Sequence, residues 1–287
     1  MEETNISQEQ NPLGTAPVGG LISKFAIPAI ISMLVSALYN IVDQIFIGQG
    51  VGMLGNAATN VAFPVTTIAT ALALLLGIGG ASNYNLEMGA GREKKASSIA
   101  GTALSTLVIT GAILAVAVLL FLRPLLGLFG ATTDVMPYAV DYLGITAVGL
   151  PFYVLSIGGN HIVRADRSPT YSMTCVLTGA VINTILDPLF IFGFGWGIKG
   201  AAWATVIGQV VSGILVIIYF GKFRKMYLET GMLKPSVECL KAIVSLGMAS
   251  CINQIAMAIV QIVMNNILRY YGGLSVYGSD IPIACVG

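Results

Sequence analysis

The sequence predicts an all-α protein, a polytopic bundle of transmembrane helices. Of its 287 residues, 56% are hydrophobic and only 9% are charged, and the mean hydropathy is +0.86. A soluble domain with this composition would have too few charged residues to cover its surface. Uncharged runs long enough to cross a bilayer also recur, at residues 44–86, 102–122, 201–220 and 245–268.

Residues 1–20 precede the apolar part of the chain. They are polar, carry Glu2, Glu3 and Glu9, and lack the basic and apolar regions that make up a signal peptide. We expect these residues to form a disordered cytoplasmic tail.

The first helix is expected at residues 21–48, with Pro28 near its start. Residues 27–42 carry no charge, and Asp43 lies nineteen residues past Lys24. This separation is about 28 Å along a helix, so the sequence places a carboxylate inside the bilayer. An ionisable group there costs about 2.5–3.5 kcal/mol on insertion scales, and it therefore usually marks an ion or substrate pathway.

Glycine, proline and charged residues separate the later helices. Residues 89–95 form a polar stop, Arg123-Pro124 closes the third helix, and the glycine-rich residues 193–200 form a hairpin. The helices between these breaks are expected at residues 57–88, 96–122, 133–163, 170–192 and 201–220. Together with the first helix they make a six-helix lobe over residues 21–221.

A second lobe is expected to begin after a linker. Residues 222–241 contain five basic residues and Pro235, and this composition indicates a cytoplasmic linker. Residues 242–287 would then hold a seventh helix, to residue 271, and the beginning of an eighth.

A weak internal repeat supports a two-lobe architecture. Residues 24–28 resemble residues 245–249 at an offset of 221, and six helices lie between them. A second copy would therefore enter the membrane in the same direction as the first, as in parallel-repeat transporters. A complete second copy would need roughly twice 221 residues in all. We expect a six-plus-six architecture that is truncated here in helix 8.

Basic residues fall mainly on one side of the predicted membrane. With the loops assigned alternately to the two sides, eleven Lys and Arg residues share the side of the N-terminus, and the other side has Arg123, Lys199 and Arg269. The positive-inside rule then makes the N-terminus cytoplasmic. We expect a multi-pass protein of the plasma membrane, with Asp43 in the outer half of the bilayer.

A second carboxylate, Asp187, lies at a matching depth. It follows Thr170 by seventeen residues, or about 25 Å, on a helix that also runs outward. Each acid has an asparagine on its own helical face, Asn40 for Asp43 and Asn183 for Asp187. An amide can donate to a carboxylate in either protonation state, as a site that loads and releases a cation requires.

Tyr142 and Thr205 fall at a comparable depth, so the same cavity could include them. The alternative is that the two acids are structural and hold the bundle together by hydrogen bonds between helices. Both interpretations require the two carboxylates to face the interior of the bundle.

Three other ionisable residues have simpler explanations. Asp141 lies near the outer mouth of its helix, and Glu87 lies near Arg92, where a solvated ion pair is expected. His161 is beside Arg164 and has no second metal-type ligand near it in the sequence.

No motif of an enzyme is present in the sequence. It contains no Ser-His-Asp arrangement, no HExxH and no P-loop. The four cysteines stand singly, without CxxC spacing. We therefore expect no enzymatic activity, no disulfide framework and no metal centre of this kind.

Several motifs resemble those of the multidrug and toxic compound extrusion (MATE) family. They are residues 26–28 and 38–48 of the first helix, 57–64, 164–169, and above all Ile182 to Pro188 with Gly200 to Thr205. The resemblance covers residues 21–271. It implies twelve helices in two six-helix lobes, and export of organic cations and amphipathic drugs by alternating access, driven by inward flow of H⁺ or Na⁺.

The same resemblance implies roles for individual residues. Asp43, Asp187 and Asn183 would couple transport to the cation, Asn40, Tyr142, Asn160 and Thr205 would line the substrate cavity, and Pro28 would be the hinge of the first helix. No cofactor is implied besides the coupling ion, and a Na⁺ ion would bind at Asp43 and Asp187. The expected partners are drug molecules, the lipid bilayer and the missing C-terminal lobe of its own chain, and no nucleic acid.

Three alternatives stay open. A flippase for lipid-linked saccharides has a related fold, but an arginine-rich cavity would support it and the spanning segments hold almost no arginine. A membrane-embedded lipid enzyme would need clustered acids, and the cytoplasmic loops carry acids only singly, at Glu93, Asp166, Glu229 and Glu238. The third alternative is a non-transporting fragment.

Overall fold

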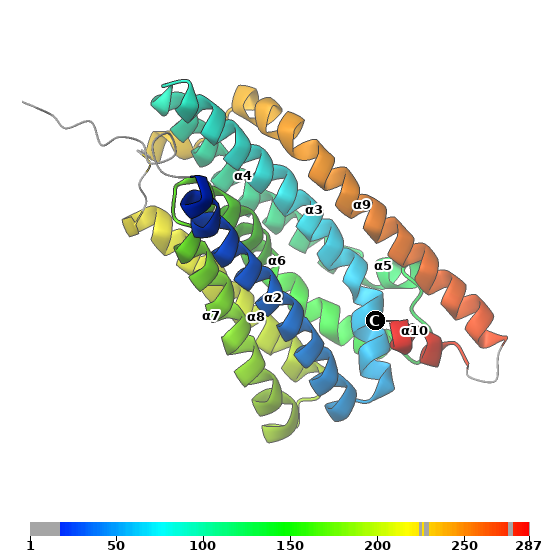
Figure 1. Ribbon diagram of the computed structural model, residues 1–287. Coiled ribbons are helices and arrows are strands. Elements are labelled where there is room, and N and C mark those ends of the chain that lie inside the picture. Colours follow the sequence, from blue (N-terminus) through cyan, green and yellow to red (C-terminus); the bar gives the residue numbers. More distant parts are fainter. Residues whose placement is uncertain (1–17, 224–225, 227–229, 275–277, 287) are drawn as a thin grey trace, which may run out of the picture.

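The structure is a computed structural model that describes residues 18–223, 226, 230–274 and 278–286. All regular secondary structure in this part of the chain is helical, and the long helices lie side by side as a bundle (Figure 1). Seven of the described helices are long and apolar enough to cross a membrane. The composition therefore predicted the class correctly, and the chain is a multi-pass membrane protein.

The spanning helices follow the predicted order. Their bounds are α2 (Val18–Gly50), α3 (Met53–Gly89), α4 (Glu93–Leu120), α6 (Met136–Ala165), α7 (Pro169–Pro188), α8 (Ile198–Ile218) and α9 (Val237–Gly273). Two π-helical turns, η1 (Leu189–Gly193) and η2 (Tyr219–Phe223), extend α7 and α8. The short helices are α5 (Leu122–Leu128), the 3₁₀ turn η3 (Thr230–Leu233) and α10 (Asp280–Val286).

Most boundaries differ from the prediction by a few residues, and three of them concern the predicted tail, the third helix and the linker. Helix α2 begins at Val18, inside the predicted tail, and residues 1–17 of that tail lie outside the described residues. The predicted third helix ends at Leu120, and the chain then turns into the separate helix α5. Helix α9 begins at Val237, inside the predicted linker, because extended Ser236 precedes it and Glu238 in the first turn favours the positive end of the helix dipole. Part of that linker also lies outside the described residues.

Helix α6 is the centre of the bundle. It packs against α3, α4 and α8, while α7 packs against α8 and α2. Helices α3 and α6 cross at Gly77 and Gly158, where a Cβ added to Gly77 would lie 2.5 Å from the Gly158 Cα. Backbones can approach this closely only where both residues lack a side chain, which is how membrane helices gain packing contacts.

Helix α9 packs along α3, as Figure 1 shows. An amide cluster joins the two helices: Gln261 donates to the Asn60 side-chain oxygen (2.7 Å), and Asn265 lies within 3.5 Å of the Asn60 backbone oxygen. Asn60 in turn donates to the carbonyl oxygen of Ile283 in α10 (2.6 Å). The seventh helix and the start of the eighth are thus hydrogen-bonded to the six-helix lobe.

Candidate functional site

The two acids predicted from depth lie together in the structure. Asp43 comes from α2 and Asp187 from the last turn of α7, and these two helices pack against each other. Asp43 is 7% exposed and Asp187 is fully buried. Their carboxyl groups lie close enough to interact electrostatically, so they share one buried site inside the bundle.

Asn183 connects this pair to α8. It lies one turn before Asp187, and in the orientation that satisfies both atoms of its amide, its nitrogen donates to Asp187 Oδ2 at 3.2 Å. The amide oxygen then accepts from the backbone N–H of Thr205, also at 3.2 Å. The opposite orientation would turn the amide oxygen toward acceptors and is therefore disfavoured.

Tyrosine hydroxyls surround the acid pair. Tyr142 of α6 lies beside Thr205 and close enough to both carboxylates to interact with them electrostatically. Tyr39 of α2 also lies near both carboxylates and near Tyr153. Residues of α2, α6, α7 and α8 therefore converge on one polar site.

Two members of the site had not been predicted. Tyr39 lies four residues before Asp43 and so shares its helical face, a signal that the sequence did contain. Tyr153 of α6 hydrogen-bonds with the Thr70 side chain of α3 at 2.9 Å. This contact depends on how α3 and α6 are rotated, which the sequence pattern did not reveal.

Asn40 and Asn160 lie apart from the acid pair. Asn40 is exposed, and its amide donates to the Ser36 carbonyl oxygen at 2.7 Å; this bond, rather than one to Asp43, holds the amide in this conformation. Asn160 is buried and donates to the Ser156 carbonyl oxygen at 2.8 Å. It follows Tyr142 by eighteen residues on α6, or about 27 Å of helix rise, so it lies at a different depth.

Pro28 lies inside the continuous helix α2. Its carbonyl oxygen accepts a hydrogen bond from the hydroxyl of Ser32 at 2.7 Å, and Ser32 is buried. The helix is therefore unbroken at the predicted hinge, and the hinge stays a prediction.

A third buried carboxylate, away from the acid pair, is that of Asp166, which the sequence predicts to be a single acid of a cytoplasmic loop. The structure keeps Asp166 in the loop between α6 and α7, but its side chain is only 2% exposed. It accepts hydrogen bonds from the hydroxyls of Tyr219 (2.7 Å) and Tyr84 (3.4 Å). By contrast, the ion pair expected at Glu87 is confirmed, since Arg92 and Lys95 both contact its carboxylate.

The oxygen atoms of the site set its chemistry. Carboxylates, an amide and hydroxyls are hard oxygen donors, which suit a proton or a hard cation. Among the described residues, Asp43 Oδ1 is buried and has no hydrogen-bond partner. A multi-pass helix bundle that buries such a pair has the construction of a membrane transporter.

Comparison with known proteins identifies the family. Residues 28–189 match the MatE family, and the chain belongs to this family, as the motifs of the first, fifth and sixth helices suggested.

Relatives in sequence are multidrug export proteins called MepA. The MepA of Staphylococcus haemolyticus (strain JCSC1435) is 28% identical over 263 residues, which cover 91% of this chain and 58% of the relative. The MepA of Staphylococcus aureus (strain NCTC 8325 / PS 47) is 28% identical over 272 residues, which cover 94% and 60%. The chain thus spans about three fifths of the length of these relatives.

Solved structures give the same picture. The MATE multidrug transporter DinF-BH is 34% identical, with a TM-score of 0.88 over 96% of this chain and 60% of that one. An inward-facing multidrug resistance MATE family transporter of the MOP superfamily is 28% identical, with a TM-score of 0.79 over 90% of this chain and 59% of that one. The helix bundle of this chain is therefore that of a MATE transporter.

Proposed function

We propose that this chain forms the first lobe, and the beginning of the second, of a cation-coupled multidrug exporter. The observation that carries the proposal is the buried pair of Asp43 and Asp187 on two packed helices. A membrane protein gains nothing in packing from two neighbouring acids, and their presence inside the bundle is explained by ion exchange.

The proposed ion step follows from electrostatics. Two neighbouring carboxylates repel each other when both are charged, and burial makes each charge more costly. A proton shared by the pair would remove this repulsion, and so would a Na⁺ ion held by the oxygens of Asp43, Asp187 and their neighbours. Asp43 Oδ1, which lacks a hydrogen-bond partner among the described residues, is the atom best placed to take the proton or the ion.

The proposed movement is that of α2. In the most apolar stretch of α2 only 6% of the residues are buried, whereas in that of α3 56% are buried. The main contact of α2 is with α7. A helix with so little buried surface can repack at low cost. Pro28 is the expected bend, because proline removes one hydrogen bond of the helix backbone.

Drug export would follow from the charge of the pair. The ionised pair attracts a cationic drug, and neutralisation by H⁺ or Na⁺ from outside removes that attraction, so the drug leaves on the outer side. The relatives named as multidrug export proteins support drugs as substrates. Organic cations and amphipathic drugs are the substrates that the family motifs imply. Asn40, Tyr142, Asn160 and Thr205 stay the candidates for the substrate cavity.

The proposal includes the orientation and the second lobe. An excess of basic residues on one side supports a cytoplasmic N-terminus. Rocking of a C-terminal lobe against this one would alternate access to the cavity.

The test is drug accumulation in cells that express the full-length protein. The Asp43→Asn and Asp187→Asn variants keep the side-chain volume and remove the charge, and we expect efflux to fall to the level of cells without the transporter. The matched control is Asp141→Asn, because Asp141 is 44% exposed and pairs with Lys199 at 3.4 Å; its efflux should equal that of the wild type.

Wild-type efflux in both acid variants, at equal expression, would refute the proposed role of the pair. A separate assay identifies the coupling ion of the wild type. Inverted vesicles are given only a pH gradient or only a Na⁺ gradient, and only the gradient of the coupling ion should drive drug uptake into them.

A further inference from the structure

Two of the three basic residues on the predicted outer side converge on one cavity. Arg123 follows α4 and Arg269 lies four residues before the end of α9, and both line a cavity of about 570 Å³ beside α5. Among the described residues, neither arginine has a salt-bridge partner. Two guanidinium groups at one cavity can bind the oxygens of a phosphate with paired hydrogen bonds.

The third basic residue of that side, Lys199, neutralises the one acid in this cavity. Asp141 also lines it, and its carboxylate lies 3.4 Å from the Lys199 ammonium group. Thr132 and Thr133 also line the cavity, and the Thr132 hydroxyl donates to the carboxylate of Asp280 at 2.7 Å. Since Asp141 is paired with Lys199, the two arginines outweigh the one remaining acid, Asp280, and leave the cavity with a net positive charge.

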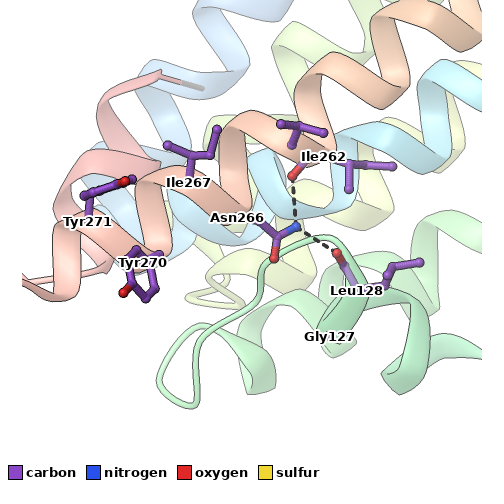
Figure 2. A pocket seen from close by; sticks show the side chains of 8 residues that line it. Gly127, Leu128, Ile262, Asn266, Ile267, Tyr270 and Tyr271 are labelled. Atoms are coloured by element: carbon purple, nitrogen blue, oxygen red, sulfur yellow. Dashed lines mark hydrogen bonds between the residues drawn. The ribbon is translucent and has the colours of Figure 1, made fainter.

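An apolar groove adjoins the arginine cavity. It has a volume of about 530 Å³ and lies between α5 and the outer part of α9, with Leu128, Ile262, Val263 and Ile267 on its walls. Figure 2 shows that Asn266 fixes its base, since this amide donates to the carbonyl oxygens of Leu128 and Ile262, both at 2.9 Å.

The groove ends at two tyrosines. Tyr270 and Tyr271 line it at the end of α9 (Figure 2), and both side chains are more than 60% exposed. Tyrosines are enriched at the level where lipid headgroups meet acyl chains. With the N-terminus in the cytoplasm, as proposed above, both cavities lie at the outer membrane interface, and the inference rests on that orientation.

We propose that this site binds an anionic glycerophospholipid of the outer leaflet. The phosphate lies between Arg123 and Arg269, and one acyl chain lies in the groove between α5 and α9. Gly127 of α5 lines both cavities, so a single molecule can extend from one into the other. A soluble anion would use the arginines and leave the groove empty, whereas a lipid fills both. This site is separate from the acid pair, and the inference does not depend on transport.

The test is native mass spectrometry of the full-length protein after reconstitution with equal amounts of phosphatidylglycerol and phosphatidylcholine. We expect the wild type to retain phosphatidylglycerol preferentially. The R123Q/R269Q variant should retain at least fivefold less phosphatidylglycerol and as much phosphatidylcholine as before. The charge-matched control is R92Q/K95Q, which removes two positive charges at the opposite ends of the spans and should retain lipid like the wild type.

A second variant tests the groove without changing any charge. A Cβ added at Gly127 meets no atom within 4 Å, so Gly127→Phe should fold and fill the junction of the two cavities. We expect it to lose phosphatidylglycerol as the arginine variant does. Retention of phosphatidylglycerol by either variant at the wild-type level would overturn the proposal, and so would equal loss of both lipids.

The source of the phosphate is tested by competition. Inorganic phosphate and glycerol 3-phosphate, added in excess, should leave the bound phosphatidylglycerol in place, because neither molecule has a chain for the groove. Complete displacement by either would mean that the arginines form a site for soluble anions, which contradicts the lipid assignment.

Discussion

The crossing of α3 and α6 can be tested with one methyl group. In a Gly77→Ala variant, the new Cβ would lie 2.5 Å from the Gly158 Cα, 2.6 Å from its oxygen and 2.9 Å from its carbonyl carbon, whereas ordinary van der Waals contact begins at 3.4 Å. All three atoms belong to the backbone, so no side chain can move aside. The helices must separate by roughly 1 Å, which is the difference between the shortest of these distances, 2.5 Å, and the 3.4 Å of an ordinary contact.

The size of the effect follows from this overlap. Overpacking typically costs about 1–3 kcal/mol, and because the neighbouring atoms are backbone we expect about 2–3 kcal/mol. For a chain of this size each kcal/mol lowers Tm by about 2–4 °C, so Tm should fall by roughly 4–12 °C. Thermal unfolding of the purified protein in detergent, followed by the loss of its monodisperse peak in size-exclusion chromatography, measures this change.

The matched control is Gly144→Ala, inside α6. The nearest atom to a Cβ there is the Leu122 Cδ2 at 3.7 Å, an ordinary contact. Both variants gain the same helix propensity, about 1 kcal/mol from Gly to Ala, so the difference between them isolates packing. If Gly77→Ala is as stable as Gly144→Ala, then α3 and α6 do not cross at this glycine and the reasoning is refuted.

Two further predictions concern the buried Asp166 and the topology of the chain in the membrane. Tyr219→Phe should lower Tm more than Tyr84→Phe, because the Tyr219 hydroxyl lies 2.7 Å from the Asp166 carboxylate and the Tyr84 hydroxyl 3.4 Å; equal losses would show that the two bonds contribute alike. A cytoplasmic N-terminus places Lys94 inside and Phe194 outside, and both are exposed. In a cysteine-free background, a membrane-impermeant maleimide added to intact cells should label Phe194→Cys and leave Lys94→Cys unlabelled, and the reverse pattern would invert the topology.

Depth in the membrane could be predicted from the sequence, because the rise per residue of a helix is fixed. That regularity placed Asp43 and Asp187 at one level, and the structure brings them together. Rotation about each helix axis is a different matter, since it depends on packing. Tyr153 and Thr70 meet across α3 and α6, and nothing in the pattern of either segment distinguishes the face that makes this contact.

Two local differences between sequence and structure have physical causes. Pro124 predicts the end of a helix, and α4 does end just before it, at Leu120, but the sequence did not predict that Pro124 is the third residue of a new helix, α5. A proline is tolerated there because the first backbone N–H groups of a helix have no partner within it. Arg164 and Arg167 flank Asp166, and nothing in this stretch of sequence indicates that the aspartate is buried. Tertiary packing instead covers this aspartate with tyrosines that lie far away in the sequence.

The geometry of the acid site depends on residues that carry no polar side chain. Helices α7 and α8 meet at Gly179 and Gly208, where a Cβ on Gly208 would lie 2.8 Å from the Gly179 oxygen and 3.3 Å from the Asn183 Cβ. Asn183, one turn after Gly179, has a short side chain, and it reaches the backbone of Thr205 at 3.2 Å because the two helices are this close. A larger residue at either glycine would separate Asn183 from Thr205 and loosen its hold on Asp187. The glycine crossing therefore belongs to the acid site as much as the side chains that surround the carboxylates.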